Sequence, residues 1–260
     1  MSDRRGREKQ APVSDWLGLT GRRVLIAGGG GTIGRALVDG FATAGATVAV
    51  TDVSDDAMAG LADQTAMSRA ADLSDAGAAR AAVSAVRDAL GGLDVFVHCV
   101  GINDRRPIED YSASEFDKII TVNLTSAFHT ATEAVVGMRE QRSGRIVFFS
   151  SVAGRSGHKH HGPYAATKGA INQLMRVIAH EYAEHGVTAN AVAPGYMDTT
   201  LTRSYLAANP DKRAALIELI PAGRFGTLSE VVDPVLFLCS PHASFITGQV
   251  LYIDGGRTIV

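Results

Sequence analysis

A tyrosine and a lysine stand four residues apart in the segment GPYAATKGAINQL, which starts at Gly162. Pro163 precedes them, and proline suits the first helical position because its ring already holds the helical φ and it has no N–H to leave unpaired. Tyr164 and Lys168 then share one helix face, a turn apart. A neighbouring positive charge lowers the pKa of a phenol from its usual value of about 10, so this pair could move a proton near neutral pH. Such pairs also decorate ordinary helices, and other residues must support the assignment.

A second candidate site lies in the segment VLIAGGGGTIGRALVDGFATAGATVAVTD. An apolar run leads into glycines and then into an amphipathic helix with Ile33, Leu37 and Phe41 on one face. Backbone N–H groups at a helix N-terminus bind phosphate, and glycine lets the ligand approach closely. Asp52 ends the next apolar run, where a carboxylate can accept hydrogen bonds from both ribose hydroxyls and repels the extra phosphate of NADP. The segment predicts a dinucleotide site that prefers NAD; a solvated strand end is the alternative for Asp52.

The elements that position these residues follow from the hydrophobic pattern. Apolar runs rich in β-branched residues alternate with helical segments and lack strict alternation, which is typical of strands covered on both faces. The expected strands span residues 23–27, 47–51, 95–100, 145–149, 188–192 and 250–253. A further strand near 66–70 is needed for the alternation of strands and helices, although its own sequence, AMSRA, is a weak strand signal. Strand and helix in series predict an α/β fold with a Rossmann-like doubly wound parallel sheet of about seven strands. We expect a flexible tail over residues 1–14 and a single domain over residues 15–260.

Composition narrows the class of function. The chain has 260 residues, 46% of them hydrophobic, which suits one domain with a sizeable core. A formal net charge of −2 favours neither nucleic acid nor an anionic membrane as partner. Cys99 and Cys239 lie in apolar runs and are expected to be buried thiols. The polar start of the chain resembles neither a signal peptide nor a membrane span, so we expect a cytoplasmic protein with a small-molecule ligand.

Taken together, these motifs resemble the short-chain dehydrogenase/reductase family. The resemblance runs from about Leu17 to Val260 and implies hydride transfer between a nicotinamide cofactor and an alcohol or ketone. YAATK resembles the family's active-site helix motif, which contains Tyr164 and Lys168. Ser151 in FFSSVAG resembles the family's catalytic serine, and its neighbour Ser150 is the less favoured choice. Asn123 in VNLTSAF resembles the asparagine that, with the serine, tyrosine and lysine, completes the family's catalytic tetrad.

By this resemblance, Tyr164 and Ser151 would contact the reacting oxygen. Lys168, with oxidised nicotinamide and a nearby helix N-terminus, would lower the pKa of Tyr164, and it would also bind the nicotinamide ribose. Asn123 would hold a water that links Lys168 to solvent. NAVAPGYMDT resembles the Pro-Gly segment that contacts nicotinamide. The expected cofactor-binding residues are Gly28, Gly31, Thr32, Ile33, Gly34, Asp52, Asp72, Leu73, Gly101, Tyr164, Lys168, Pro194, Gly195 and Thr199.

Two segments depart from the family pattern. Thr32 stands where the family usually has a glycine at the start of the helix, and Gly29, Gly31 and Gly34 offer an alternative glycine register. The Asn-Asn-Ala-Gly segment that usually follows the fourth strand reads HCVG here, residues 98–101. Because that segment mainly supports the backbone, we expect a repacked strand end with activity retained.

The substrate site has fewer signals. Arg105 and Arg106 follow the fourth strand, where ligands of parallel sheets bind, and a guanidinium can clamp a carboxylate. GINDRR resembles the corresponding loop of gluconate-type sugar-acid dehydrogenases; a solvated basic loop is the alternative. His158 and His161, with His160 between them, have poor spacing for metal ligands and no carboxylate or cysteine partner, so we expect substrate contacts and no metal. Residues 199–224 would form a lid, and Ser151 would also touch the substrate.

The leading interpretation is an NAD-dependent oxidoreductase that acts on a sugar acid or polyol, with NADP as the less favoured cofactor. A 3-oxoacyl thioester reductase that uses NADPH has the same catalytic motifs and is the first alternative. A nucleotide-binding sensor without turnover is the second, disfavoured because a sensor has no need of a proton-transfer set. The family resemblance also implies a homotetramer.

Overall fold

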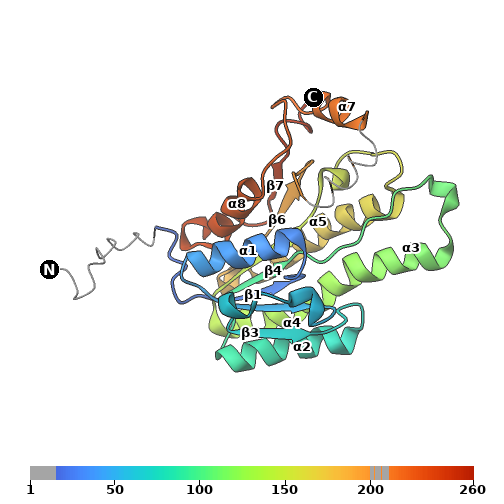
Figure 1. The fold of residues 1–260 in the computed structure, drawn as a ribbon. Helices are drawn as coiled ribbons and strands as arrows, with labels where there is room; N and C mark the ends of the chain where they lie inside the picture. The colour runs from blue at the N-terminus through green and yellow to red at the C-terminus, as the bar shows by residue number, and fades with distance from the viewer. Residues whose placement is uncertain (1–15, 200–201, 203–205, 207–210) are drawn as a thin grey trace.

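A seven-stranded parallel sheet forms the centre of the computed structural model, which describes residues 16–199, 202, 206 and 211–260 (Figure 1). The strands are β1 (Arg23–Ala27), β2 (Thr47–Asp52), β3 (Met67–Ala70), β4 (Val95–His98), β5 (Gly144–Phe149), β6 (Val187–Pro194) and β7 (Val250–Ile253). Their order across the sheet is β3-β2-β1-β4-β5-β6-β7. The predicted fold class is therefore confirmed. The expected tail over 1–14 and nine positions of the expected lid (200–201, 203–205 and 207–210) lie outside the described residues.

The central strands are apolar because both of their faces are covered. All four residues of β4 are buried, as are four of the five in β1. The fourth strand ends at His98, two residues before its predicted end. There the backbone N–H of Cys99 donates to Ala27 O (2.9 Å), and Val100 N then lies 2.9 Å from where a Cβ on Gly28 would stand. The chain thus leaves the sheet to pack beside the glycine loop.

The helices are α1 (Thr32–Thr43), α2 (Ala76–Leu90), α3 (Ala113–Ile120), α4 (Ser126–Gln141), α5 (Gly162–Tyr182), α7 (Lys212–Glu218) and α8 (Ser229–Cys239). Local chemistry sets several of their ends. Asp75 caps α2 by accepting from the Ala78 backbone N–H at 2.7 Å, and Gly91 ends that helix in the left-handed region. Ser112 and Glu115 form a capping box on α3. Pro163 lies in the first turn of α5, as predicted.

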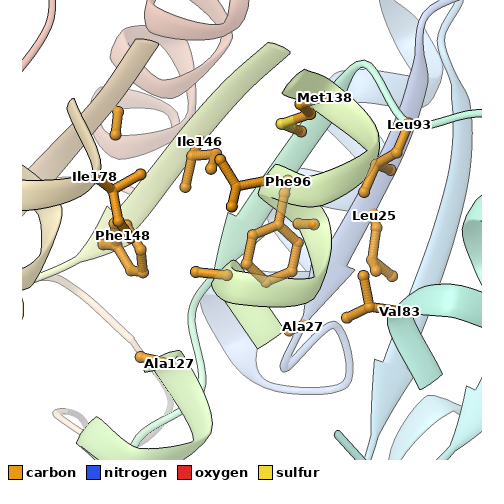
Figure 2. Close-up of a cluster of buried hydrophobic side chains, with 14 of the residues drawn as sticks. Leu25, Ala27, Val83, Leu93, Phe96, Ala127, Met138, Ile146, Phe148 and Ile178 are labelled. Carbon is orange, nitrogen blue, oxygen red and sulfur yellow. The ribbon is translucent and has the colours of Figure 1, made fainter. Parts of the chain in front are cut away.

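Two layers of helices cover the sheet (Figure 1). Helices α1 and α8 pack together on one face, and α2, α4 and α5 cover the other. Figure 2 shows part of the second layer's core, in which Phe96 and Phe148 lie among aliphatic side chains such as Leu25 and Ile146. Burial of these apolar side chains holds the helices against the sheet. Among the described residues, no helix is both long and apolar enough to cross a membrane.

The carboxyl ends of the central strands meet at one edge of the sheet. Ala27 pairs with His98, which in turn pairs with Phe148. The chain adds β2 and β3 on one side of β1 and then continues with β4 on its other side. Ligands of open parallel sheets bind outside the carboxyl edge at such a change of direction. The segments that follow β1, β4 and β5 are therefore expected to form a ligand-binding site.

Candidate active site

The structure brings the four predicted catalytic residues to this edge from three elements. Ser151 follows β5, and Tyr164 and Lys168 lie one turn apart on α5. Asn123 is buried in a π-helical turn, Thr121–Thr125, between α3 and α4. Tyr164, Lys168 and Ser151 line one cavity of about 300 Å³. The arrangement brings a phenol, a hydroxyl and an ammonium group to the wall of one cavity.

The surroundings of Tyr164 act on its pKa in opposite directions. Burial raises the pKa of Tyr164 above its ordinary value, while a hydrogen bond with Ser151 and the charge of Arg105 act in the opposite direction. Nζ of Lys168 lies 5.5 Å from the centroid of the Tyr164 ring, within the range of about 4–6 Å over which a positive charge favours the phenolate. That the lysine, together with bound nicotinamide, tunes the tyrosine stays a prediction. Desolvation of the phenol is the larger effect here.

Lys168 is an enclosed ammonium group. Its residue is only 4% exposed, and Nζ donates a hydrogen bond to Phe149 O at 2.7 Å. Burial lowers the pKa of Lys168 to about 8. The lysine thus remains largely charged near neutral pH. Its charge destabilises the folded state, because removal of an ammonium group from water disfavours the charged form.

The side chain of Asn123 is occupied by protein partners. Its Oδ1 accepts from Ile102 N at 2.7 Å, and its Nδ2 donates to Ile102 O at 2.9 Å and to Thr167 Oγ1 at 3.2 Å. Both amide hydrogens are therefore used, and the side chain is not free to donate to a water. These bonds hold the segment after β4 against α5, and the expected role of Asn123 in holding a water stays a prediction.

In the segment that departs from the family pattern, the buried His98 packs against α4. Its ring nitrogens lie 3.3 Å from Ser126 Oγ and 3.2 Å from Thr130 Oγ1 on α4. Burial, reinforced by the charge of Lys168, lowers the pKa of His98 to about 3, so the ring is neutral. Cys99 is only partly buried, contrary to expectation, and its thiol donates to Ala27 O at 3.1 Å.

The glycine loop packs tightly against the start of α1. Gly28 has a φ of +84°, a backbone conformation that residues with a Cβ rarely adopt. A Cβ on Gly34 would stand 2.1 Å from Gly28 O, so only glycine permits this close approach of helix and loop. Gly31 precedes the helix, and no side chain caps the N-terminus of α1. The first backbone N–H groups of α1 therefore have no side-chain acceptor, as an anion site requires.

Asp52 lies beside this loop at the end of β2. Its Oδ2 accepts from Gly30 N at 2.9 Å, and its Oδ1 accepts from Val53 N at 2.7 Å. Each carboxylate oxygen thus retains acceptor capacity for one more donor. The pair of oxygens suits the two hydroxyls of a ribose.

A second cavity, of about 460 Å³, extends from the glycine loop past Asp52 to Asp72 and Leu73. It has Cys99, Gly101 and Ile102 in common with the first cavity, so the two adjoin. Of the predicted cofactor residues, the second cavity also includes Gly28 and Gly31, and the first includes Ile33, Tyr164, Lys168, Pro194, Gly195 and Thr199. Thr32 and Gly34 line neither cavity in the described residues. The joined cavities, the uncapped helix and the carboxylate fit an extended dinucleotide.

The predicted substrate residues separate into two groups. Arg105, His158 and His161 line the first cavity. Arg106 forms ion pairs with Asp104 and with Glu115, the latter at 2.7 Å, and its guanidinium lies over the Tyr111 ring. The two adjacent arginines therefore have different surroundings. Arg106 braces its loop and lines neither cavity of the described site.

Sequence reasoning missed several residues that line the first cavity. Asn103 lies in the quoted GINDRR loop, and Tyr196 and Met197 lie in the quoted NAVAPGYMDT segment. Their place in those motifs was a signal that could have identified all three. Thr202 had no comparable signal, because a segment beyond a strand end has no periodicity from which to infer the direction of a side chain.

Comparisons with known proteins agree with this geometry. A family model described as enoyl-(acyl carrier protein) reductase matches residues 28–258. The chain is 33% identical over 247 residues to 3-oxoacyl-[acyl-carrier-protein] reductase FabG of Vibrio harveyi, which covers 94% of this chain and 100% of the relative. It is 37% identical over 248 residues to a tropinone reductase homologue of Arabidopsis thaliana, covering 93% of this chain and 94% of that one.

Among solved structures, one similar protein is a gluconate 5-dehydrogenase from Burkholderia cenocepacia J2315 in complex with NADP and tartrate. It is 32% identical, has a TM-score of 0.88, and the match covers 95% of this chain and 98% of that chain. Both the sequence relatives and this structure thus span nearly the whole chain.

Proposed function

Because this chain belongs to the short-chain dehydrogenase/reductase family, whose members are NAD(P)-dependent oxidoreductases, we propose that it uses NAD to interconvert a secondary alcohol and a ketone on a sugar acid or polyol. The observation that carries the substrate class is the charge around the first cavity. Arg105 and Lys168 line it, and none of its described lining residues is an aspartate or a glutamate. A site of this sign favours an anionic substrate.

The histidines add a second element to this specificity. Burial lowers the pKa of both His158 and His161, so near pH 7 they are neutral groups that each offer one donor and one acceptor. Such groups suit the hydroxyls of a sugar chain. Arg105 is then the cation for the carboxylate at the end of that chain.

The chemistry assigned to the residues is proton transfer and orientation. Bound nicotinamide would supply the hydride acceptor for oxidation and the hydride donor for reduction. In oxidation, the substrate O–H bond breaks and its proton passes to the Tyr164 phenolate, while the carbon–oxygen double bond forms as hydride departs from carbon. Ser151 would donate a hydrogen bond to the same substrate oxygen, and Lys168 would supply positive charge beside it.

Replacing Asp52 with alanine should weaken NADH binding by about 10- to 100-fold, because hydrogen bonds to a charged group contribute about 1.5–3 kcal/mol. NADPH binding should be unchanged or tighter, since the repulsion of a 2′-phosphate is removed. A fluorescence titration of wild type and Asp52→Ala with each cofactor measures both effects. Asp63→Ala, which removes an exposed carboxylate from a nearby turn, should bind both cofactors like wild type.

The wild-type titration decides the cofactor independently of any substrate. The related gluconate 5-dehydrogenase holds NADP, so NADP is the alternative cofactor that the titration must test. Tighter binding of NADPH than NADH by wild type would overturn the assignment of NAD. It would also move 3-oxoacyl thioester reduction to first place, a function that the name of the Vibrio harveyi relative supports.

Replacing Arg105 with alanine should raise KM for a hexonic acid about 10- to 100-fold, because a charge-assisted pair is lost, and should leave KM for a neutral polyol within about twofold. Steady-state kinetics on a panel of hexonic acids, polyols and 3-oxoacyl thioesters provides both numbers. Lys159→Ala removes an exposed cation from the adjacent loop and serves as the control. Equal effects of Arg105→Ala on charged and neutral substrates would contradict a carboxylate clamp.

Two further expectations belong to this proposal. The expected lid over 199–224 is supported by α7 and by a small apolar cluster of Leu206, Ile220 and Phe225 that packs against Tyr196, a residue of the first cavity.

The expected homotetramer is supported by apolar side chains exposed on α4 and α5, among them Phe128 and Val177, each 45% exposed.

A further inference from the structure

The Arg35 side chain reaches from the first turn of α1 to the wall of the second cavity. Its Nε donates to Gly30 O at 2.9 Å, its Nη2 to Ala57 O at 2.7 Å and its Nη1 to Ala59 O at 2.9 Å. Gly30 belongs to the glycine loop, whereas Ala57 and Ala59 belong to the segment that follows β2. One guanidinium therefore joins two segments that are far apart in the sequence.

Gly30 is held on both sides of its Cα. Its N–H donates to Asp52 Oδ2, and its carbonyl accepts from Arg35 Nε. The space around it is closed, because a Cβ on Gly30 would stand 2.3 Å from Ala57 O and 3.0 Å from Asp52 Oδ2. Gly30, Asp52 and Ala57 all line the second cavity. The separation of these walls, and the direction of the Asp52 carboxylate, thus depend on the contacts that join them.

We infer that Arg35 is a positioning residue for cofactor selectivity: it clamps Gly30 to the Ala57–Ala59 segment and thereby keeps Asp52 directed into the cavity. This inference rests on the proposed function, in which Asp52 binds the ribose diol. Arginine suits the task because its planar fork has five N–H donors, so three carbonyl groups can be satisfied at fixed angles. Lysine has one nitrogen and cannot reproduce that span.

The clamp differs from a simple charge effect. A positive charge near the cofactor attracts the pyrophosphate of NADH and NADPH alike, and the extra phosphate of NADPH more strongly. Loss of charge alone would therefore weaken both cofactors and would favour NADH in relative terms. Loss of the clamp frees Gly30 and Asp52, so NADH loses its ribose contacts while NADPH, which gains nothing from Asp52, is affected less. The two explanations predict opposite changes in selectivity.

The test compares Arg35→Ala and Arg35→Lys with wild type, using fluorescence titration with NADH and NADPH. Arg80→Ala, which removes an exposed helical arginine from α2, is the matched control. Both Arg35 variants should lower the ratio of the NADPH to the NADH dissociation constant at least fivefold, and Arg80→Ala should not change it. In the cofactor-free proteins, hydrogen exchange of peptides covering residues 28–35 and 52–60 should be faster in the Arg35 variants alone.

Each other outcome contradicts the inference. An unchanged ratio in both variants, with only a lower melting temperature, would reduce Arg35 to a structural role. A raised ratio in Arg35→Ala that returns to the wild-type value in Arg35→Lys would assign the effect to charge. If Arg35→Ala does not fold, Arg35→Lys still carries the test, since it retains the charge and the stem. Wild type that prefers NADPH would overturn the proposed cofactor instead, and this outcome is visible before any variant is made.

Discussion

Replacement of Tyr164 by phenylalanine should lower kcat for alcohol oxidation by about 10²- to 10⁴-fold, the range that general acid–base groups contribute. The phenylalanine ring preserves the packing and removes only the oxygen that exchanges a proton with the substrate. The Kd for NADH should stay within about twofold of wild type, because the phenol acts on the substrate oxygen. Steady-state kinetics and cofactor titration on the same preparation measure the two effects.

The pH profile adds an independent check on Tyr164. Burial raises the pKa of this phenol, and oxidation requires the phenolate, so the oxidation rate of wild type should rise with pH. Tyr164→Phe should lose that dependence. Tyr182→Phe removes a phenol from the other end of α5 and should behave like wild type. Retention of more than a tenth of wild-type kcat by Tyr164→Phe would remove the tyrosine from the proposed proton transfer.

Replacement of Lys168 by methionine should lower the activity and remove a rise of stability with pH. The volume of the side chain is nearly kept, whereas the buried charge and the bond to Phe149 O are lost. Turnover should fall by at least about 10²-fold, since positive charge at the site of proton transfer is removed. Cofactor affinity should fall as well if the lysine binds the nicotinamide ribose.

The stability effect follows from the pKa of about 8 in the folded protein against an ordinary value of 10.5. Between these values the unfolded chain binds the proton and the folded protein does not, so this lysine makes stability rise with pH. Below pH 8 the folded state carries the full cost of the buried charge. The free energy of unfolding of wild type, relative to Lys168→Met, should therefore increase by about 2–3 kcal/mol from pH 7 to pH 10.

Urea denaturation of both proteins at pH 7 and pH 10 measures this difference. Lys118→Met replaces an exposed lysine on α3 and should show no comparable change. A difference between wild type and Lys168→Met that is the same at both pH values would mean that Lys168 does not titrate in the folded protein in this range.

Much of the architecture followed from local sequence. Each of the seven expected strands is present. The central strands were visible without the fold because strands covered on both faces need apolar residues at nearly every position, whereas β3, with alternating exposed residues, was expected only from the alternation of strands and helices. Pro163 predicted the first turn of α5, and the helical spacing of Tyr164 and Lys168 predicted their common direction. The glycine loop was recognisable because a tight strand-to-helix turn needs residues without a Cβ.

The surroundings of the site residues were decided by tertiary structure alone. The pKa of Tyr164 depends on how completely the phenol is enclosed, and that enclosure comes from segments far away in the chain. Arg105 and Arg106 are adjacent in sequence, yet one lines the cavity and the other pairs with Asp104 and Glu115. The direction of a side chain in a loop is set by its partners, which no periodicity records.

The hydrogen-bond partners of Asn123 and Arg35 were also decided by tertiary structure. Asn123 was predicted from its motif, but its amide partners, Ile102 and Thr167, are fixed by the packing of three elements. Arg35 reads as an ordinary helical arginine until the loop after β2 is brought against it. Sequence by itself determined which residue types line the carboxyl edge of the sheet. The fold decided their hydrogen-bond partners and protonation, because both depend on distances between residues remote in the chain.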